Sequence, residues 1–401
     1  MKICGVIAEY NPFHTGHALQ LTETRRVLGD DTAIVCVMSG NYVQRGDLAV
    51  MEKYRRAQVA AQCGADLVLE LPLGAALSSA EGFARGGVRA LDALGAVGFL
   101  SFGSECGSTR ALLQAAQALE QPRVQRAFQA ALREGLSYAA ARQKALSAVD
   151  AQSAALLSTS NNTLGLEYCR AIAAEGSLLT PFSIRRRGAA HDSSAPAQDF
   201  ASASLLRSHL AAQNLAACAP YLPSPSLSML RQAINCGEAP VCLSDIDGAL
   251  LSHLRRLSAN DLARYDSDSE GFQNRLAQAI RDGAGFEAIC EHAQTRRYPL
   301  ARVRRALLRA WLDLPLDECG KPPSYLRVLA IGPQGRALLR LFSKTARVPL
   351  ITKPLHEKEL PEMMQPTLAR DVLGDDLYAL AFSASDRRVG GSHFRKTPYC
   401  D

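Results

Sequence analysis

The first hundred residues alternate short apolar runs with longer helical segments, and this alternation limits the possible folds more than any other feature of the chain. Strands of a parallel sheet are buried on both faces and therefore read as near-continuous apolar runs. Each consecutive parallel pair also needs a crossover helix. The predicted strands are residues 2–8, 33–38, 66–71 and 97–102, and the predicted helices are residues 16–28, 50–63 and 80–94. The pattern predicts an α/β fold, with a doubly wound parallel sheet and helices on both faces.

The rest of the chain is mainly helical in pattern. We expect helices over residues 108–149, a helix opening near 161–162, a strand over 178–186, a helix from 202, further helices through 312, strands over 325–331 and 349–352, and a helix over 335–345. Pro223 and Pro225 favour a boundary near residues 215–225, which predicts an α/β domain over 1–215 and a mainly helical C-terminal domain over 216–401. The tail over 389–401 is rich in Gly, Arg and Lys and is expected to fray.

Cysteine usage indicates the compartment. The eleven cysteines are an odd number, and none falls in a CxxC or zinc-ligand pattern. Thiols in apolar surroundings are typical of reduced cytosolic proteins, so we expect a cytoplasmic protein. The apolar run at the start is too short for a signal peptide, and no stretch approaches the roughly 20 residues of a membrane span. No protein partner or oligomeric state can be inferred from the sequence.

The strongest local signal lies between the first predicted strand and the first helix, where residues 9–17 read EYNPFHTGH. In an open α/β sheet this turn binds phosphates, because helical N–H groups and the helix dipole face the strand ends. His14 and His17 can bring two imidazole donors to one phosphate, and Gly16 lets the backbone approach closely. The alternative is a capping histidine beside a surface histidine. Two histidines around a glycine in this turn favour phosphate binding.

Other polar positions fall at the same predicted sheet edge. Gly103 ends a strand where a side chain would block a ligand, although it can equally be an ordinary turn glycine. Asn161 is expected to cap a helix, which leaves Asn162 as the better ligand candidate. The loop over residues 39–47 opens on this edge and favours substrate contact. The pair at residues 191–192 is either a base for an attacking amine or a hydrogen-bonded loop pair.

The residues His14, Gly16 and His17 resemble the HxGH signature of the nucleotidyltransferase superfamily, whose Rossmann-like domains transfer AMP or CMP through in-line attack on an α-phosphate. Ser202, Ser204 and Arg207 resemble the later helix-opening motif of that superfamily, and such hydroxyls and an arginine suit the β- and γ-phosphates. A narrower resemblance, to the bacterial tRNA-Met cytidine acetate ligases, covers essentially the whole chain. The matching segments are residues 9–17, 38–47, 64–72, 102–105, 160–168, 184–186 with 191–192, and 325–329.

The resemblance implies a two-step reaction. Acetate and ATP would give acetyl-adenylate and pyrophosphate, and the acetyl group would pass to the wobble cytidine of elongator tRNA-Met. The implied catalytic residues are His14 and His17. The implied nucleotide contacts are Ile7, Ala8, Glu9, Tyr10, Asn11, Pro12, Phe13, His14, Gly16, His17, Gln20, Gly103, Asn162, Arg185 and Arg186. The segment after Arg186 is one residue shorter than the family pattern, which leaves Arg185, Arg186 and Arg187 as alternatives for one nucleotide-contacting arginine.

We expect catalysis by positioning and charge stabilisation, with both histidines donating to phosphate oxygens as pyrophosphate leaves. Mg²⁺ is expected to accompany the ATP phosphates, although no carboxylate cage and no other set of metal ligands can be read from the sequence. Residues 1–215 would then form the ATP-binding catalytic domain. The C-terminal domain would bind tRNA.

A basic run in the second half supports RNA binding. Six arginines fall within the fourteen positions 296–309. Their only acidic neighbour at helical spacing is Asp313, so the run lacks the pattern of a helix with its own salt bridges. A solvated helix face is the alternative. The predicted phosphate contacts are Arg296, Arg297, Arg302, Arg305 and Arg309.

Three other functions compete with an acetate ligase. One is another HxGH enzyme that activates a carboxylate or transfers a nucleotidyl group on a small molecule. The second is a remnant of a class I aminoacyl-tRNA synthetase, although no KMSKS loop is found in the expected context. The third is an RNA-binding protein that senses ATP without turnover. Pyrophosphate release with acetate, measured with and without tRNA, separates these possibilities.

Overall fold

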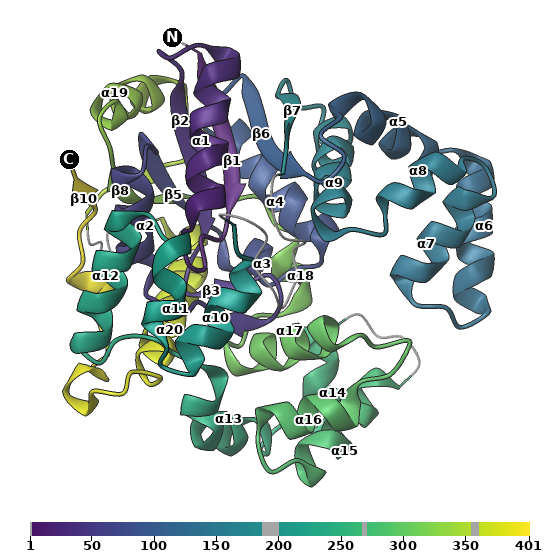
Figure 1. The fold of residues 1–401 in the computed structure, drawn as a ribbon. Helices are drawn as coiled ribbons and strands as arrows, with labels where there is room; N and C mark the ends of the chain where they lie inside the picture. Colours follow the sequence, from purple (N-terminus) through teal and green to yellow (C-terminus); the bar gives the residue numbers. More distant parts are fainter. Residues whose placement is uncertain (1, 187–199, 267–270, 354–360) are drawn as a thin grey trace.

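The structure is a computed structural model that describes residues 2–186, 200–266, 271–353 and 361–401. Its centre is an eight-stranded sheet (Figure 1). The strands of this sheet are β1 (Ile3–Ala8), β2 (Ala33–Ser39), β5 (Leu67–Leu71), β6 (Phe99–Ser104), β7 (Thr180–Arg185), β8 (Leu326–Ile331), β9 (Leu350–Ile351) and β10 (Tyr399–Cys400). A separate hairpin of β3 (Tyr42–Val43) and β4 (Asp47–Leu48) follows β2. The predicted α/β class is confirmed.

The strands run in the order β10-β8-β5-β2-β1-β6-β7, with β9 beside β8. From β5 to β7 all neighbours are parallel. The chain goes from β1 through β2 to β5 on one side, and then from β6 to β7 on the other. The strand order therefore reverses at β1, and in open α/β sheets ligands bind at the carboxyl ends of the strands beside such a reversal.

The alternation of side chains along the strands separates two cores. Val35 and Val37 of β2 pack on one face, in a cluster with Phe83 and Leu91. Cys36 and Met38 belong to the cluster on the other face, because successive strand residues point to opposite faces. Every residue of β2 is buried, as expected for a central parallel strand.

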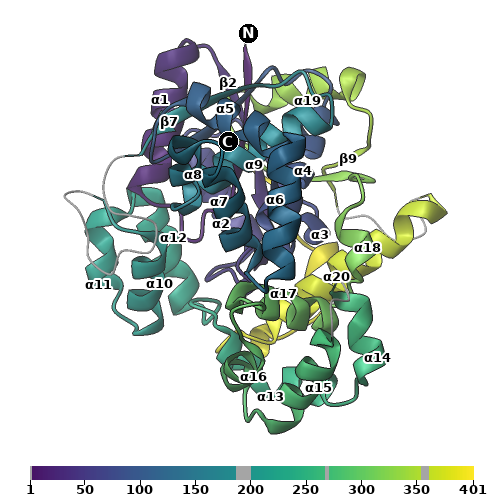
Figure 2. The ribbon, with the colours of Figure 1, turned by 90° about the vertical axis from the view of Figure 1, so that its right-hand side faces the viewer.

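The helices cover both faces of the sheet and extend beyond it (Figures 1 and 2). Those before β8 are α1 (Thr15–Leu28), α2 (Lys53–Gln62), α3 (Leu73–Ala76), α4 (Ala80–Asp92), α5 (Thr109–Leu119), α6 (Pro122–Arg133), α7 (Tyr138–Ser147), α8 (Ala151–Leu156), α9 (Ser160–Ala174), α10 (Ala203–Ala211), α11 (Leu215–Cys218), α12 (Ser224–Asn235), α13 (Asp247–Leu254), α14 (Ala259–Leu262), α15 (Phe272–Asp282), α16 (Phe286–Ala293), α17 (Leu300–Trp311) and α18 (Leu316–Cys319). Those after β8 are α19 (Gly335–Thr345) and α20 (Gln365–Ala379).

The helices α13–α17 form a group that we call the helical lobe. It lies below the sheet in both views (Figures 1 and 2) and has its own apolar core. Tyr42 and Leu48 of the β3–β4 hairpin and Leu77 also enter this core. The helical lobe is therefore packed directly against the segments that follow β2 and β5.

The sequence predicted a mainly helical C-terminal domain over residues 216–401, but strands of that segment belong to the central sheet. After the helical lobe the chain returns to the sheet, where β8 pairs antiparallel with β5. β10 then pairs parallel with β8. The predicted fraying of the tail is also wrong, because His393 is buried and residues 399–400 form β10. Because β8 pairs with β5, the edge of β5 is covered, and an exposed edge strand that could pair with another chain is avoided there.

None of the described helices is long and apolar enough to cross a membrane. All eleven cysteines lie among the described residues and are free thiols.

Candidate active site

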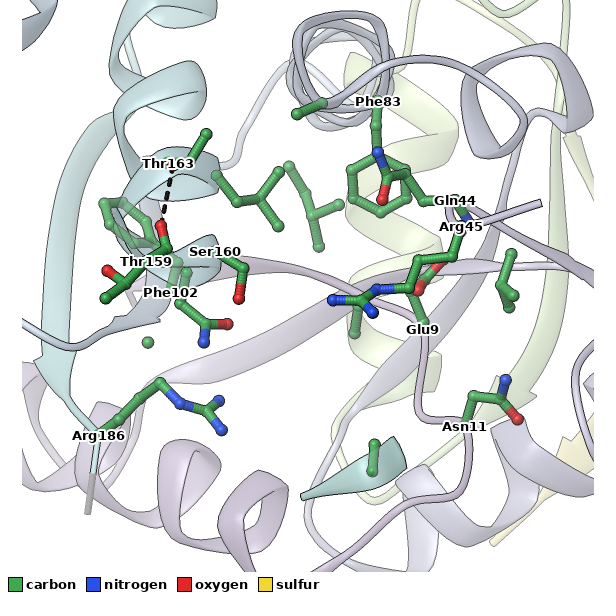
Figure 3. Close-up of a pocket in the computed structure, with 18 of the residues that line it drawn as sticks. Glu9, Asn11, Gln44, Arg45, Phe83, Phe102, Thr159, Ser160, Thr163 and Arg186 are labelled. Atoms are coloured by element: carbon green, nitrogen blue, oxygen red, sulfur yellow. Dashed lines mark hydrogen bonds between the residues drawn. The ribbon is translucent and has the colours of Figure 1, made fainter. Parts of the chain in front are cut away.

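A cavity of about 1030 Å³ opens at the carboxyl ends of β1, β2 and β6, next to the reversal in strand order (Figure 3). The predicted residues that line it are Ile7, Ala8, Glu9, Tyr10, Asn11, His14, His17, Gln20, Gly103, Arg186 and Arg207. Gly16 and Arg185 line a smaller pocket that shares His14, His17 and Arg186 with the cavity. Most of the predicted nucleotide contacts thus surround one space.

The two histidines are stacked, with ring centroids 3.7 Å apart and an interplanar angle of 20°. The Nδ1 of His14 accepts the backbone N–H of Gly16 at 3.1 Å. The Nδ1 of His17 accepts the backbone N–H of His14 at 3.2 Å. A neutral imidazole with Nδ1 as acceptor carries its proton on Nε2. Both rings therefore have Nε2–H donors, and both line the cavity.

These contacts also make the start of α1. His14 is the N-cap residue, and His14 and His17 form a reciprocal capping box. The alternative reading of His14 as a cap is thus correct, and it is compatible with the predicted role because capping uses Nδ1 alone. Gly16 is required sterically, since a Cβ there would lie 2.9 Å from Cε1 of His14.

Glu9 joins β1 to the hairpin that follows β2. Its Oε1 accepts the backbone N–H of Gln44 at 2.7 Å and the hydroxyl of Ser39 at 3.1 Å. Burial raises the pKa of Glu9. Gln44, Arg45 and Asp47 all line the cavity, so the loop after β2 opens on the predicted sheet edge, and its contact with substrate stays a prediction.

The opposite wall is organised by Glu105, whose carboxylate accepts from Thr159 Oγ1 at 3.0 Å, Asn161 Nδ2 at 2.7 Å and the N–H of Asn162 at 2.8 Å. Burial alone would raise the pKa of Glu105, but these hydrogen bonds hold it below the usual value. The carboxylate thereby supplies the cap of α9 from outside the helix.

The prediction for the asparagine pair is reversed. Asn162 does not line the cavity, because its side chain is buried and its Oδ1 accepts the backbone N–H of Cys106 at 3.0 Å. Asn161 lines the cavity instead. The N-cap of α9 is Thr159, two residues before the expected Asn161, and two residues turn a helix by about 200°.

Of the candidate arginines after β7, Arg186 lines the cavity, and its guanidinium points into it (Figure 3). Burial lowers its pKa. A Cβ on Gly103 would lie 3.2 Å from Cγ of Arg186, so the glycine leaves room for this side chain. Arg185 lines the smaller pocket only. Arg187 and residues 191–192 lie outside the described residues.

The residues of the helix-opening motif at α10 have different roles: one caps the helix and another lines the cavity. Ser202 is buried and caps α10, since its hydroxyl accepts the N–H of Leu205 at 3.0 Å. Arg207 lines the cavity and donates to Asn11 O at 3.0 Å and to Ser204 Oγ at 3.1 Å. Neither serine lines the cavity, and Pro12 and Phe13 do not line it either. Of Ser202, Ser204 and Arg207, only Arg207 therefore lines the cavity.

The basis of the RNA prediction for α17 is wrong, because acidic partners come from other segments. Asp266 lies 2.6 Å from Arg302 Nη2 and 3.0 Å from Arg309 Nη2. Arg309 is only 3% exposed and also donates to Leu77 O at 2.9 Å, so RNA cannot reach it. Arg305 donates to Gln44 O at 3.1 Å. RNA contact by Arg296, which is exposed, and by the half-buried Arg297 stays a prediction.

Several cavity residues were not predicted as site residues. Outside the loop over residues 39–47, whose contact with substrate was predicted, they are Ala80, Phe83, Phe102, Glu105, Ser158, Thr159, Ser160, Asn161, Tyr168 and Arg304, among others. The polar run at residues 158–161 and the loop after β2 were visible signals. Arg304 had none, since it reaches the cavity through tertiary packing. Within the described residues, no group of three or more His, Cys, Asp or Glu is placed to hold a metal ion.

Known proteins resemble this chain over nearly its whole length. A family model described as HIGH Nucleotidyl Transferase matches residues 1–392. The tRNA(Met) cytidine acetate ligase of Acetivibrio thermocellus is 35% identical to the chain, over 98% of this chain and 98% of that protein. The protein of the same name from Caldanaerobacter subterraneus subsp. tengcongensis is 36% identical, over 95% of this chain and 96% of that protein.

Two solved structures have the same fold as this chain. The crystal structure of Thermotoga maritima TmcAL bound with alpha-thio ATP matches with a TM-score of 0.92 at 31% identity, covering 100% of this chain and 99% of that chain. The apo form of the same protein matches with a TM-score of 0.94 at 30% identity, with the same coverage. The likeness extends over the whole fold.

Proposed function

Since this chain belongs to the HIGH nucleotidyl transferase family, among the tRNA(Met) cytidine acetate ligases, we propose that it activates acetate with ATP and acetylates the wobble cytidine of elongator tRNA-Met in the cytoplasm. The product is N4-acetylcytidine. The observation that carries this proposal is the stacked pair of His14 and His17, with both Nδ1 atoms occupied by backbone N–H groups at the start of α1.

In the first step an acetate oxygen forms a bond to the α-phosphorus, and the bond from that phosphorus to the bridging oxygen of pyrophosphate breaks. The Nε2–H groups of His14 and His17 donate to the phosphate oxygens, where negative charge accumulates in the transition state. The N–H groups at the start of α1 add to the same positive potential. Because the capping contacts fix both rings before ATP binds, little reorganisation is needed during the step.

Arginines supply further positive charge at the phosphates. Arg186 and Arg207 both line the cavity; Arg186 directly follows β7, and Arg207 lies on α10. We assign Arg207 to the β- and γ-phosphates and Arg186 to the nucleotide beside Gly103. Mg²⁺ bound by the ATP phosphates would add charge neutralisation.

In the second step the exocyclic amine of cytidine attacks the acetyl carbon of acetyl-adenylate, and AMP leaves with the electron pair of the broken C–O bond. The amine loses one proton. The cavity has room for both reactants, because about 1030 Å³ reaches the upper end of the usual range for ligand sites. The loop after β2 closes the side of the cavity away from β6 and β7.

The test is pyrophosphate release measured with ATP alone, with acetate, and with acetate and tRNA-Met. We expect release that depends on acetate in the absence of tRNA, and N4-acetylcytidine when tRNA is added. A carboxylate-activating enzyme for a small molecule would acetylate no tRNA under these conditions. Pyrophosphate release that does not depend on acetate would contradict the proposal.

A further inference from the structure

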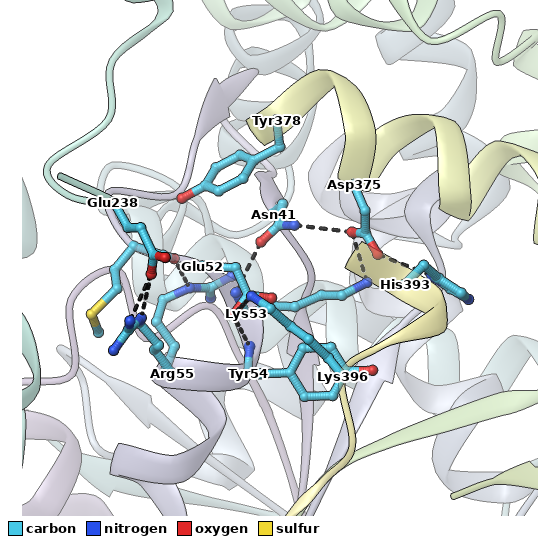
Figure 4. Close-up of polar contacts among 12 residues, drawn as sticks. Asn41, Glu52, Lys53, Tyr54, Arg55, Glu238, Asp375, Tyr378, His393 and Lys396 are labelled. Atoms are coloured by element: carbon cyan, nitrogen blue, oxygen red, sulfur yellow. Dashed lines mark hydrogen bonds and ion pairs between the residues drawn. The ribbon is translucent and has the colours of Figure 1, made fainter. Parts of the chain in front are cut away.

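The β3–β4 hairpin brings Gln44 and Arg45 to the cavity, and its position is fixed from two directions. At its base, Asn41 Nδ2 donates to Asp375 Oδ1 at 3.0 Å, and Asn41 Oδ1 accepts the N–H of Lys53 at 2.9 Å. Lys53 Nζ lies 2.9 Å from Asp375, and His393 Nδ1 lies 3.0 Å from the other oxygen of that carboxylate (Figure 4). Because this network is buried, the base of the hairpin is rigid.

At its tip, the hairpin is held by the backbone N–H and the backbone carbonyl of Gln44. The N–H of Gln44 donates to Glu9 at 2.7 Å, and the carbonyl of Gln44 accepts from Arg305 Nη1 at 3.1 Å. Glu9 belongs to the sheet edge, whereas Arg305 belongs to α17 of the helical lobe. The Gln44 backbone therefore lies between the catalytic sheet and the helical lobe.

Two further contacts join the same hairpin to α17. Gly46 has φ +76°, and a Cβ on it would lie 2.7 Å from the backbone N of Arg305. The hairpin and α17 thus approach each other through backbone, which only glycine allows. Arg304 Nη1 lies 3.6 Å from Asp47 Oδ2, and its Nη2 lies 2.5 Å from Glu287 Oε1. Arg304 therefore links the hairpin to α16 as well.

The hairpin lies on the β2 side of the reversal in strand order, whereas Gly103 and Arg186 lie on the β6–β7 side. Figure 3 shows Arg45 and Arg186 entering the cavity from opposite walls. The ATP contacts proposed above come from α1, from Gly103 of β6, from Arg186 after β7 and from Arg207 of α10. The wall that carries Gln44 and Arg45 is then left for the acceptor nucleotide.

We propose that Arg305 is a positioning residue for acetyl transfer, which holds the Gln44 carbonyl so that Arg45 faces the acceptor nucleotide from the β2 side of the cavity. This rests on the proposed function, because it assigns a part of the same site to the second step. Arg305 does not contact RNA in this account. Burial, together with the neighbouring Arg309, lowers the pKa of Arg305 to about 10, which still leaves it charged at neutral pH.

The test is Arg305→Met, with the two half-reactions measured separately. We expect kcat for acetyl transfer to tRNA-Met to fall about 10- to 100-fold, since a displacement of about 1 Å has this effect on positioned reactants. The KM for tRNA and the acetate-dependent release of pyrophosphate without tRNA should change less than about threefold. Arg305→Lys retains a donor for the carbonyl and should restore most of the transfer rate.

Two further variants complete the test. Gly46→Ala should reproduce the loss of acetyl transfer, because the added Cβ would clash with the backbone of α17 and push the hairpin away from that helix. Arg281→Met is the matched control, since Arg281 is exposed on α15 and donates to Gln278 of its own helix. Arg281→Met should leave both half-reactions unchanged.

Three results would overturn the proposal. A raised KM for tRNA with unchanged kcat, and a log-affinity against log-salt slope flattened by about 0.7 to 0.9, would make Arg305 a phosphate contact. Equal loss of both half-reactions with a lower thermal midpoint would make it structural only. Full transfer activity in Arg305→Met would remove any role. If the wild-type protein releases no pyrophosphate with acetate, the proposed function itself fails, which is distinct from all three.

Discussion

Arginines gather both at the carboxyl edge of the sheet and on α17, but the two regions use them differently. At the sheet edge, Arg186, which follows β7, and Arg207, on α10, both line the cavity. On α17, Arg302 and Arg309 share Asp266, and Arg305 holds the hairpin. Spacing along the helix suggested an RNA surface, whereas the structure shows a packed interface. The role of an arginine therefore depends on the groups that face it in the fold, including acidic partners that are distant in sequence.

The largest effect should come from removing the shared carboxylate on the α17 side. Asp266→Ala leaves Arg309 buried without its counter-charge, which typically costs about 3 to 5 kcal/mol. Denaturant unfolding should show this loss in the free energy of unfolding. Asp386→Ala is the control, since Asp386 is 80% exposed in its pair with Arg387, and such surface pairs contribute about 1 kcal/mol or less. Equal losses in the two variants would contradict the packing role of α17.

At the sheet edge the main effect should be on chemistry rather than stability. His17→Ala removes one Nε2–H donor and should lower acetate-dependent pyrophosphate release about 10²- to 10³-fold, the usual loss for one such donor. Binding of tRNA should be unchanged. His292→Ala, at an exposed position on α16, should have no effect. Near-normal release by His17→Ala would remove the histidine pair from the mechanism.

A smaller effect at the same edge should separate nucleotide binding from folding. Gly103→Val places a side chain within 3.2 Å of Arg186 Cγ and should weaken ATP binding about tenfold, or about 1.4 kcal/mol. Gly98→Val is the matched control, because a Cβ at Gly98 meets nothing within 4 Å. Calorimetric titration with ATP measures the difference. A collapsed thermal midpoint with unchanged ATP affinity would make Gly103 purely structural.

The smallest effect concerns the cap of α9. The pKa of Glu105 is lowered in the folded protein, so its stabilisation is present above the unfolded pKa of about 4.3 and is lost as the pH falls through the folded pKa. Wild-type protein should therefore lose more stability between about pH 5 and pH 3 than Glu105→Gln. Thermal midpoints across this range measure the difference. Parallel losses in the two proteins would show that the carboxylate does not stabilise the helix start.

The sequence predicted the elements whose signals are local. The near-continuous apolar run of β2 and the helix of α19 were found with bounds within one residue of those observed. The histidine pair could also be predicted, because its spacing and its place after β1 are both local features. Most of the nucleotide contacts that the family resemblance implies line the same cavity.

Features set by distant partners could not be predicted. The return of β8 to β5 depends on a pairing between residues 67–69 and 328–331, which no local pattern shows. The partner of Arg309 lies in another element, so the absence of a nearby acid was misleading. The roles of Asn161 and Asn162 were exchanged because α9 starts two residues earlier than expected, where Glu105, which follows β6, caps it.

Acetate-dependent exchange of pyrophosphate into ATP without tRNA, in the wild type, His17→Ala and Arg305→Met, tests most directly the division between the two regions. This exchange reports acetyl-adenylate formation alone. We expect exchange in the wild type, its loss in His17→Ala, and nearly full exchange in Arg305→Met. Exchange that persists in His17→Ala, or that disappears in Arg305→Met, would contradict the assignment of this chemistry to the sheet edge and of positioning to α17.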